Sequence, residues 1–212
     1  MKTKFLRLMG ACLCLLPFAL QAQSLPKPKE FYFDEDASTA RPIVLFEGGD
    51  DTTIQRLMRA RERGGRGSAE ATAQLARLAY DTGRTDTAEA LYQSAYREVG
   101  SQGRLHASLL WNHGWDLYRS GDAGAALARW REAGIDRFVN PAWVPPTIAL
   151  ALWTLDRRQE AVDWYAAAVR TEPAQWRDPA NLPALLPGWR PEELAALKDV
   201  AAAWAADPPA WP

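Results

Sequence analysis

Three eight-residue stretches decide the fold of this chain. They read Ala-Glu-Ala-Leu-Tyr-Gln-Ser-Ala at 88–95, Ala-Leu-Ala-Arg-Trp-Arg-Glu-Ala at 126–133 and Ala-Val-Asp-Trp-Tyr-Ala-Ala-Ala at 161–168. Each stretch has an alanine, an aromatic residue four positions later and a second alanine three positions after that. Intervals of four and three residues put these side chains on one face of an α-helix. The first alanines are 38 and 35 residues apart, so the sequence predicts a helical repeat.

Each stretch follows a turn and an earlier helical segment that carries a large residue before a small one. The turns fall at 81–83, 120–122 and 155–157, and the large–small pairs are Leu75-Ala76, His113-Gly114 and Ile148-Ala149. The small residue allows the two helices of a pair to approach closely, and the aromatic residue fills the gap towards the next pair. The sequence therefore predicts an all-α fold, a short solenoid of three antiparallel helix pairs over residues 67–174.

This pattern resembles the tetratricopeptide repeat family, whose period is 34 residues. The resemblance covers residues 69–173 in three degenerate copies, and the four additional residues of the first interval fit the connection at 100–103. The leading tryptophan of the family is missing from all three copies, where the chain has Thr72, Leu110 and Pro145. We expect the first helix of the third copy to start late, with Pro146 in its first turn.

The resemblance implies a binding protein without catalysis. In the family, the first helix of each pair lines a concave groove, and three repeats suffice to hold a peptide or protein segment there. Matching positions in this chain give the candidate partner-binding residues, with Leu150 beside them: Arg77, Tyr80, Trp111, Trp115, Tyr118, Arg119 and Trp153.

Tryptophan is the least ordinary feature of the composition, because there are ten and none precedes residue 111. The repeat explains Trp130, but it gives Trp111 and Trp115 no packing role. Two interpretations stay open. Either the two rings bind a partner, or the N-terminal or C-terminal segment folds over the groove and buries them.

The kind of partner has an alternative as well. Tryptophan faces stack on sugar rings, so the chain is also interpretable as a module that binds cell-wall glycan. Stacking on sugars would leave Trp111 and Trp115 exposed and nearly coplanar. A peptide groove would instead pair them with polar side chains such as Arg77 and Arg119, and Arg119 lies four residues after Trp115, a spacing that suits a cation–π pair.

Residues 1–22 have the layout of a secretory signal peptide, with a positive start, a short apolar segment and Ala22 before the expected cut. The apolar segment Leu8–Leu20 is too short to be a membrane anchor, since spanning a bilayer needs about 20 residues. Cys12 lies in a context that only faintly matches a lipoprotein signal. We therefore expect an exported bacterial protein, periplasmic or secreted, that starts at Gln23 and has no transmembrane segment after cleavage.

Residues 23–66 are expected to form an arm and a leading helix. Prolines break the arm, and residues 43–46 form either one short strand or, as we favour, an extended segment that packs on the helices. The leading helix should have Asp50 or Asp51 as its N-cap and should stop at the glycines of 64–67.

Residues 175–212 are expected to contain a proline-rich segment and a capping helix. An open solenoid needs an element that covers its last pair. A helix that begins at Pro191 provides one apolar stripe for this purpose: Leu194, Leu197, Val200, Ala201 and Trp204.

Composition and motifs exclude most other classes. Of the 212 residues, 48% are apolar and 24% charged, as in ordinary globular proteins. Both cysteines lie in the expected signal peptide, whose removal leaves 22 basic against 26 acidic residues and no thiolate metal ligand. The chain has no excess of basic residues that would indicate a nucleic-acid partner. The arginine-rich stretch at 56–66 is interpreted as a solvated helix face rather than a phosphate-docking surface.

No motif indicates an enzyme, a cofactor or a metal site. His106 and His113 are seven residues apart, whereas a helical metal pair needs a spacing of three or four. We interpret both histidines as structural or surface residues, and we expect neither cofactor nor metal. The sequence leaves the oligomeric state open.

Overall fold

The protein is described by a computed structural model over residues 25–36, 38–65, 67–136 and 139–210, so the expected signal peptide lies outside the described residues. Within these ranges the chain forms helices and no strand. The elements are α1 Asp51–Arg63, α2 Ser68–Asp81, α3 Thr85–Val99, α4 Arg104–Arg119, α5 Ala123–Trp130, a π-helical segment Arg131–Ile135, α6 Val144–Thr154, α7 Arg158–Thr171, α8 Pro173–Trp176, a 3-10 helix Pro179–Asn181, α9 Leu182–Leu185 and α10 Pro191–Ala206.

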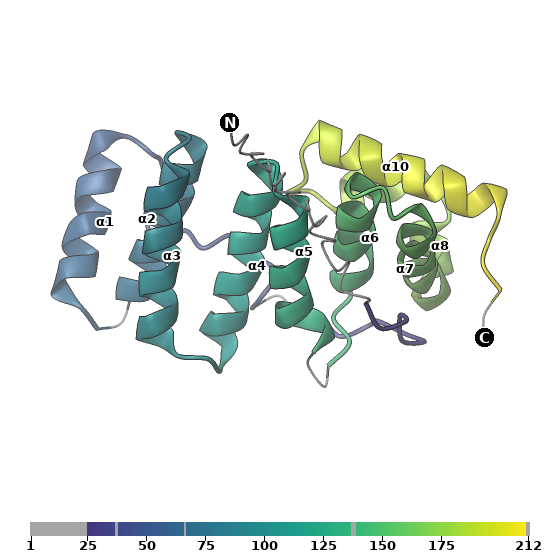
Figure 1. The fold of residues 1–212 in the computed structure, drawn as a ribbon, viewed down its shortest axis with the longest axis horizontal. Helices are drawn as coiled ribbons and strands as arrows, with labels where there is room; N and C mark the ends of the chain where they lie inside the picture. The colour runs from purple at the N-terminus through teal and green to yellow at the C-terminus, as the bar shows by residue number, and fades with distance from the viewer. Residues whose placement is uncertain (1–24, 37, 66, 137–138, 211–212) are drawn as a thin grey trace, which may run out of the picture.

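Helices α1 to α7 stand next to one another in chain order (Figure 1). The pairs α2 with α3, α4 with α5 and α6 with α7 pack most extensively, and α1 packs on α2. This arrangement confirms the predicted all-α, solenoid-like stack of helix pairs.

The face predicted from the repeated stretches is the buried face of each second helix. Its nine side chains are at most 3% exposed: Ala88, Tyr92, Ala95, Ala126, Trp130, Ala133, Ala161, Tyr165 and Ala168. The local spacing of four and three therefore corresponds to the packing surface.

Close approach of paired helices is most evident between α4 and α5. A Cβ atom placed on Gly114 would lie 2.3 Å from Nε1 of Trp130, far inside van der Waals contact. The same indole Nε1 donates a hydrogen bond of 3.1 Å to the backbone oxygen of Trp111. Ala76 and Ala149, the corresponding small residues of the other pairs, are fully buried.

Ala126→Leu is expected to destabilise the protein by about 1–3 kcal/mol, the usual cost of overpacking. Ala126 has no exposed surface and lies one turn before the buried ring of Trp130. Chemical denaturation measures the change. A midpoint equal to that of the wild type would show that position 126 has room for a larger side chain and that the repeat phase is wrong.

Several helix ends agree with the sequence. The side chain of Asp50 caps α1 by accepting a 2.8 Å hydrogen bond from the backbone N–H of Thr53, and α1 stops before Gly64. Helix α10 begins at Pro191 as predicted. Helix α6 begins at Val144, so Pro146 lies in its first turn as expected, and Pro145 precedes it there.

The N-terminal arm, the described residues of 25–49, lies along α7, α4 and α2. Near its start, the backbone N–H of Tyr32 donates a 3.0 Å hydrogen bond to the hydroxyl of Thr171. Residues 43–46 are not a strand, because they bond to helix side chains instead of a neighbouring strand. The favoured interpretation of an extended, packed arm is thus the one that the structure adopts.

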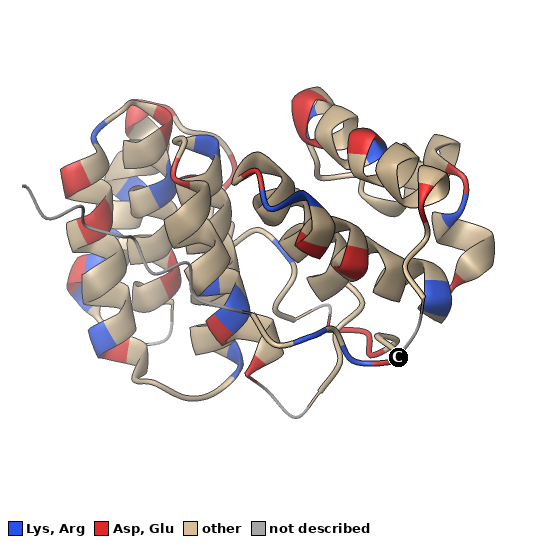
Figure 2. Cartoon of the chain, turned by 45° about the vertical axis from the view of Figure 1, so that its right-hand side comes forward, with Lys and Arg blue, Asp and Glu red and all other residues tan. Residues whose placement is uncertain are grey.

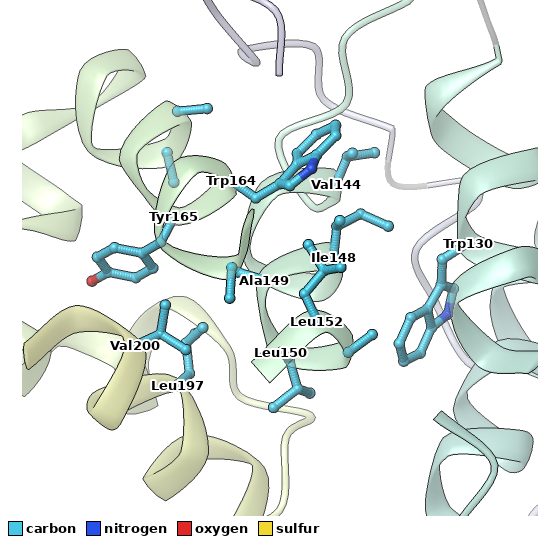
Figure 3. Close-up of a cluster of buried hydrophobic side chains, with 14 of the residues drawn as sticks. Trp130, Val144, Ile148, Ala149, Leu150, Leu152, Trp164, Tyr165, Leu197 and Val200 are labelled. Atoms are coloured by element: carbon cyan, nitrogen blue, oxygen red, sulfur yellow. The ribbon is translucent and has the colours of Figure 1, made fainter. Parts of the chain in front are cut away.

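Helix α10 covers the end of the solenoid by packing on α6 and α7 (Figure 1). Figure 3 shows Leu197 and Val200 of α10 beneath Tyr165 of α7, while Trp130 faces Ile148 from the neighbouring pair. These side chains belong to one large apolar cluster that runs from α4 to α10. The C-terminal half therefore has a continuous core, which fixes the position of the segment between α7 and α10.

Acidic and basic residues are interspersed along the helices (Figure 2). In the arginine-rich stretch, the described arginines of α1 are exposed, and the guanidinium carbon of Arg56 lies 4.0 Å from the ring centroid of Phe46. This placement agrees with a solvated helix face. Arg66 lies outside the described residues.

Candidate functional site

A cavity of about 520 Å³ lies between α4, the arm and the segment that follows α7. This volume is within the range of about 300–1,000 Å³ that small-ligand pockets occupy. We call it the tryptophan pocket because five indoles line it: Trp111, Trp115, Trp143, Trp176 and Trp189. Polar side chains complete the wall: Arg77, Asn112, Asp116, Arg119, Thr147, Glu172 and Gln175.

The arm forms one wall, and two side-chain amides of the repeat hold its backbone. Asn112 of α4 accepts a hydrogen bond from the N–H of Ile43 at 3.0 Å and donates one to the carbonyl of Arg41 at 2.9 Å. Gln74 of α2 accepts from the N–H of Leu45 at 2.7 Å. Both amides are buried, so their hydrogen bonds keep the arm in place at the rim of the pocket.

The C-terminal segment forms the opposite wall through Trp189. Its ring lies 5.0 Å from that of Trp115, at an interplanar angle of 72°. Trp115 also meets Trp130 edge-on at 4.9 Å and Trp111 at 6.0 Å. Edge-to-face contacts of this kind stabilise a fixed ring arrangement.

Trp115 has a packing role in the structure, which corrects the sequence-based expectation that it has none. It is only 4% exposed, because Trp130 covers it from within the repeat and Trp189 from the C-terminal segment. Of the two interpretations left open, coverage by the chain's own segments accounts for Trp115. Trp111 is less buried and lies at the edge of the same cluster.

Arg119 is fixed by an ion pair inside the protein. Its Nε donates to Oε1 of Glu193 at 2.8 Å, and Nη2 reaches Oε2 at 3.2 Å. The Glu193 side chain is 2% exposed, and the guanidinium stands over the ring of Trp115 at 4.8 Å. The predicted cation–π pair therefore exists, but most of the charge of Arg119 is balanced by α10.

Arg77 differs from Arg119, because it makes no hydrogen bond or ion pair with the described residues. Its Nε is covered from solvent and has no acceptor among them. The Nε1 atoms of three pocket tryptophans, Trp111, Trp115 and Trp143, are also covered from solvent and have no acceptor among the described residues. Covered donors without an acceptor are costly, so the packing of this wall carries an energetic cost at these four nitrogens.

Asp116 is an acidic residue in the wall of the tryptophan pocket. It is 8% exposed, and its Oδ2 accepts a 2.6 Å hydrogen bond from the hydroxyl of Tyr92. Burial raises the pKa of Asp116 to about 7, against the opposing effects of that hydrogen bond and of Arg77 and Arg119. The carboxyl group therefore changes its charge near neutral pH.

A second, more polar cavity of about 350 Å³ adjoins the first and shares Arg77, Asp116 and Arg119 with it. Its other lining residues are Tyr80, Asp81, Ser120 and Arg190. We call it the arginine cavity. The two cavities together form one site with an aromatic part and a charged part.

The structure brings four of the seven sequence-predicted residues to the tryptophan pocket: Arg77, Trp111, Trp115 and Arg119. Tyr80 lines only the arginine cavity, and its hydroxyl donates to Glu89. Tyr118 and Trp153 line neither. The hydroxyl of Tyr118 bonds to that of Thr154 at 2.8 Å, and Trp153 lies under the guanidinium of Arg158 at 3.9 Å.

Sequence reasoning missed Asp116 and three tryptophans of the pocket, Trp143, Trp176 and Trp189. The concentration of tryptophan after residue 111 was the available signal. This concentration alone could not assign the three tryptophans to one site, because they lie in segments outside the repeated stretches.

His113 has the structural role that its position in the repeat suggested. It has no exposed surface and lies 4.0 Å from the ring of Tyr92 in a parallel stack. Its ring nitrogens contact Glu89 at 2.7 Å and the hydroxyl of Tyr96 at 3.0 Å. Burial lowers the pKa of His113 despite the carboxylate of Glu89. This histidine thus fixes α3 against α4.

The part of the chain that the structure describes contains no group of three or more potential metal-ligating His, Cys, Asp or Glu side chains. None of its described helices combines the length and the apolar character needed to cross a bilayer. No family model, no curated protein and no solved structure matches the chain.

Proposed function

We propose that this protein is a non-catalytic, periplasmic binding protein of the tetratricopeptide repeat type, which holds a peptide or protein segment in the tryptophan pocket. The observation that carries the proposal is the convergence of four groove residues predicted from the repeat on one cavity of about 520 Å³. The export signal expected in residues 1–22 supports a partner in the cell envelope.

The walls of the pocket favour a preorganised site. Tryptophans held edge-to-face lose little conformational freedom when a ligand binds, so more of the contact energy appears as affinity. The arm itself illustrates how an extended chain fits this face. Asn112 and Gln74 bind its backbone, while Ile43 is buried against the helices.

The glycan alternative has less support. Stacking on sugars would require exposed, nearly coplanar rings at Trp111 and Trp115, but their interplanar angle is 71° and Trp115 is buried. The close guanidinium of Arg119 matches the expectation for a peptide groove.

Trp111→Ala is expected to weaken binding of a selected peptide by at least about 2 kcal/mol, roughly 30-fold in Kd, as the loss of an aromatic anchor does. Peptides are first enriched from a random library displayed on phage, and each Kd is then measured by titration calorimetry. Trp153→Ala is the matched control, since it deletes the same side chain outside the pocket and should leave Kd unchanged. Equal Kd values for the two variants, or a library that enriches no peptide, would refute the proposal.

A further inference from the structure

Three guanidinium groups line the arginine cavity from three different elements. Arg77 comes from α2, Arg119 from α4 and Arg190 from the residue directly before α10. They meet here because α10 packs on α6 and α7, and the residue before its start lies near the C-terminal ends of α2 and α4.

The charges of this cavity are unequally compensated. Arg119 is neutralised by Glu193, which is almost fully buried. Arg77 has no such partner among the described residues, although it lies at the junction of both cavities. The acids that line the arginine cavity are Asp81 and Asp116, and Asp116 already accepts a hydrogen bond from Tyr92. Arg77 therefore acts on Asp116 only through space, and no hydrogen bond or ion pair within the described residues occupies its guanidinium.

We propose that the arginine cavity binds an oxyanion, a carboxylate or phosphate group, of the same ligand that occupies the tryptophan pocket, with Arg77 and Arg190 as its donors. The inference rests on the proposed function, because it assumes that the tryptophan pocket binds a ligand. Guanidinium groups match oxyanions in geometry and bind them through two parallel hydrogen bonds. The ligand is thus amphipathic, with an apolar or ring-shaped part next to an anionic group.

The charge of Asp116 makes binding of such a ligand depend on pH. Burial raises its pKa to about 7. Below that value the neutral carboxyl group does not repel the anion, and above it the carboxylate does. Binding is therefore tighter below about pH 7 and weaker above it, and the ligand anion favours protonated Asp116. The charged and titratable groups around Asp116 are Arg77, Tyr80 and Asp81 on α2, Tyr92 on α3, Arg119 on α4, and Arg190 with Glu193 at the start of α10.

Four probes that share one indole body test the subsite by titration calorimetry. Indole-3-acetate and indoxyl phosphate are anionic, indole-3-acetamide is neutral and tryptamine is cationic. At about pH 6, at least one anionic probe should bind at least about tenfold more tightly than the amide, and tryptamine most weakly. The order of the two anions identifies the source of the oxyanion. The advantage of the anions over the amide should shrink at about pH 8.

Three variants connect this preference to the named residues. Arg77→Gln should remove the advantage of the anions and leave the Kd of the amide unchanged. Asp116→Asn should keep the preference for anions and abolish its dependence on pH. Arg158→Gln, which removes a guanidinium that lies over Trp153 instead, is the matched control and should behave as the wild type.

Three outcomes overturn the subsite. The first is equal affinity for the anionic, neutral and cationic probes; if Trp111→Ala then weakens all four, the tryptophan pocket still binds ligands and only the oxyanion inference fails. The second is an anion preference that persists in Arg77→Gln, which would assign recognition to other residues. Absence of binding by every probe also contradicts the inference, and the selected peptides then decide on the proposed function separately.

Discussion

Replacing Trp130 by alanine is expected to lower the free energy of unfolding by about 3–5 kcal/mol, the usual cost of a large cavity in a core. Trp130 has no exposed surface, and its ring fills the space between α4 and the third helix pair. Its indole N–H would also lose the hydrogen bond to the carbonyl of Trp111. Gly114 has no side chain to fill the space that the lost ring leaves beside it.

Urea denaturation of Trp130→Ala and Trp153→Ala measures this effect against a matched control. Both variants lose the same side chain, but Trp153 lies partly exposed under Arg158. Trp153→Ala should therefore lower the free energy of unfolding clearly less than Trp130→Ala does. If both variants lose the same free energy of unfolding, the buried ring at position 130 contributes no more to stability than the partly exposed ring at position 153.

The repeat and its buried face follow from the sequence because they depend on local spacing. Alanines and aromatic residues at intervals of four and three mark one helix face, whatever the rest of the chain does. The small residue at Gly114 was also readable, since it recurs in phase with Ala76 and Ala149. These features place the helix pairs and therefore most of the candidate groove.

The site itself depends on contacts that carry no periodic signal. Trp189 covers Trp115 from a position 74 residues later in the chain, within a segment broken by prolines. The pKa of Asp116 is raised by burial, and burial here depends on how three separate segments pack. The sequence contains one signal for the position of the arm. Gln74 and Asn112, whose side chains bind the arm, are 38 residues apart and therefore occupy equivalent positions in successive repeats.

Trp115→Ala is the second substitution with a large expected effect, a loss of about 3–5 kcal/mol in the free energy of unfolding. The sequence alone suggested a small cost, because the repeat gives this residue no packing role. In the structure its ring is 4% exposed and touches rings from both the repeat and the C-terminal segment. The variant should therefore lose the support that holds Trp189 and, through it, the wall of the tryptophan pocket.

A double-mutant cycle with Trp189→Ala tests this reason and not only the size of the loss. The edge-to-face pair should contribute a coupling energy of about 0.5–1.5 kcal/mol, so the double variant should be more stable than the two single losses predict together. Trp111→Ala provides the comparison at the rim of the same cluster and should cost less stability than Trp115→Ala. If Trp115→Ala melts as the wild type does, the C-terminal segment does not cover this ring in solution. Trp115 would then be available to a ligand. The roles proposed here, structural for Trp115 and ligand-binding for Trp111, would have to be exchanged.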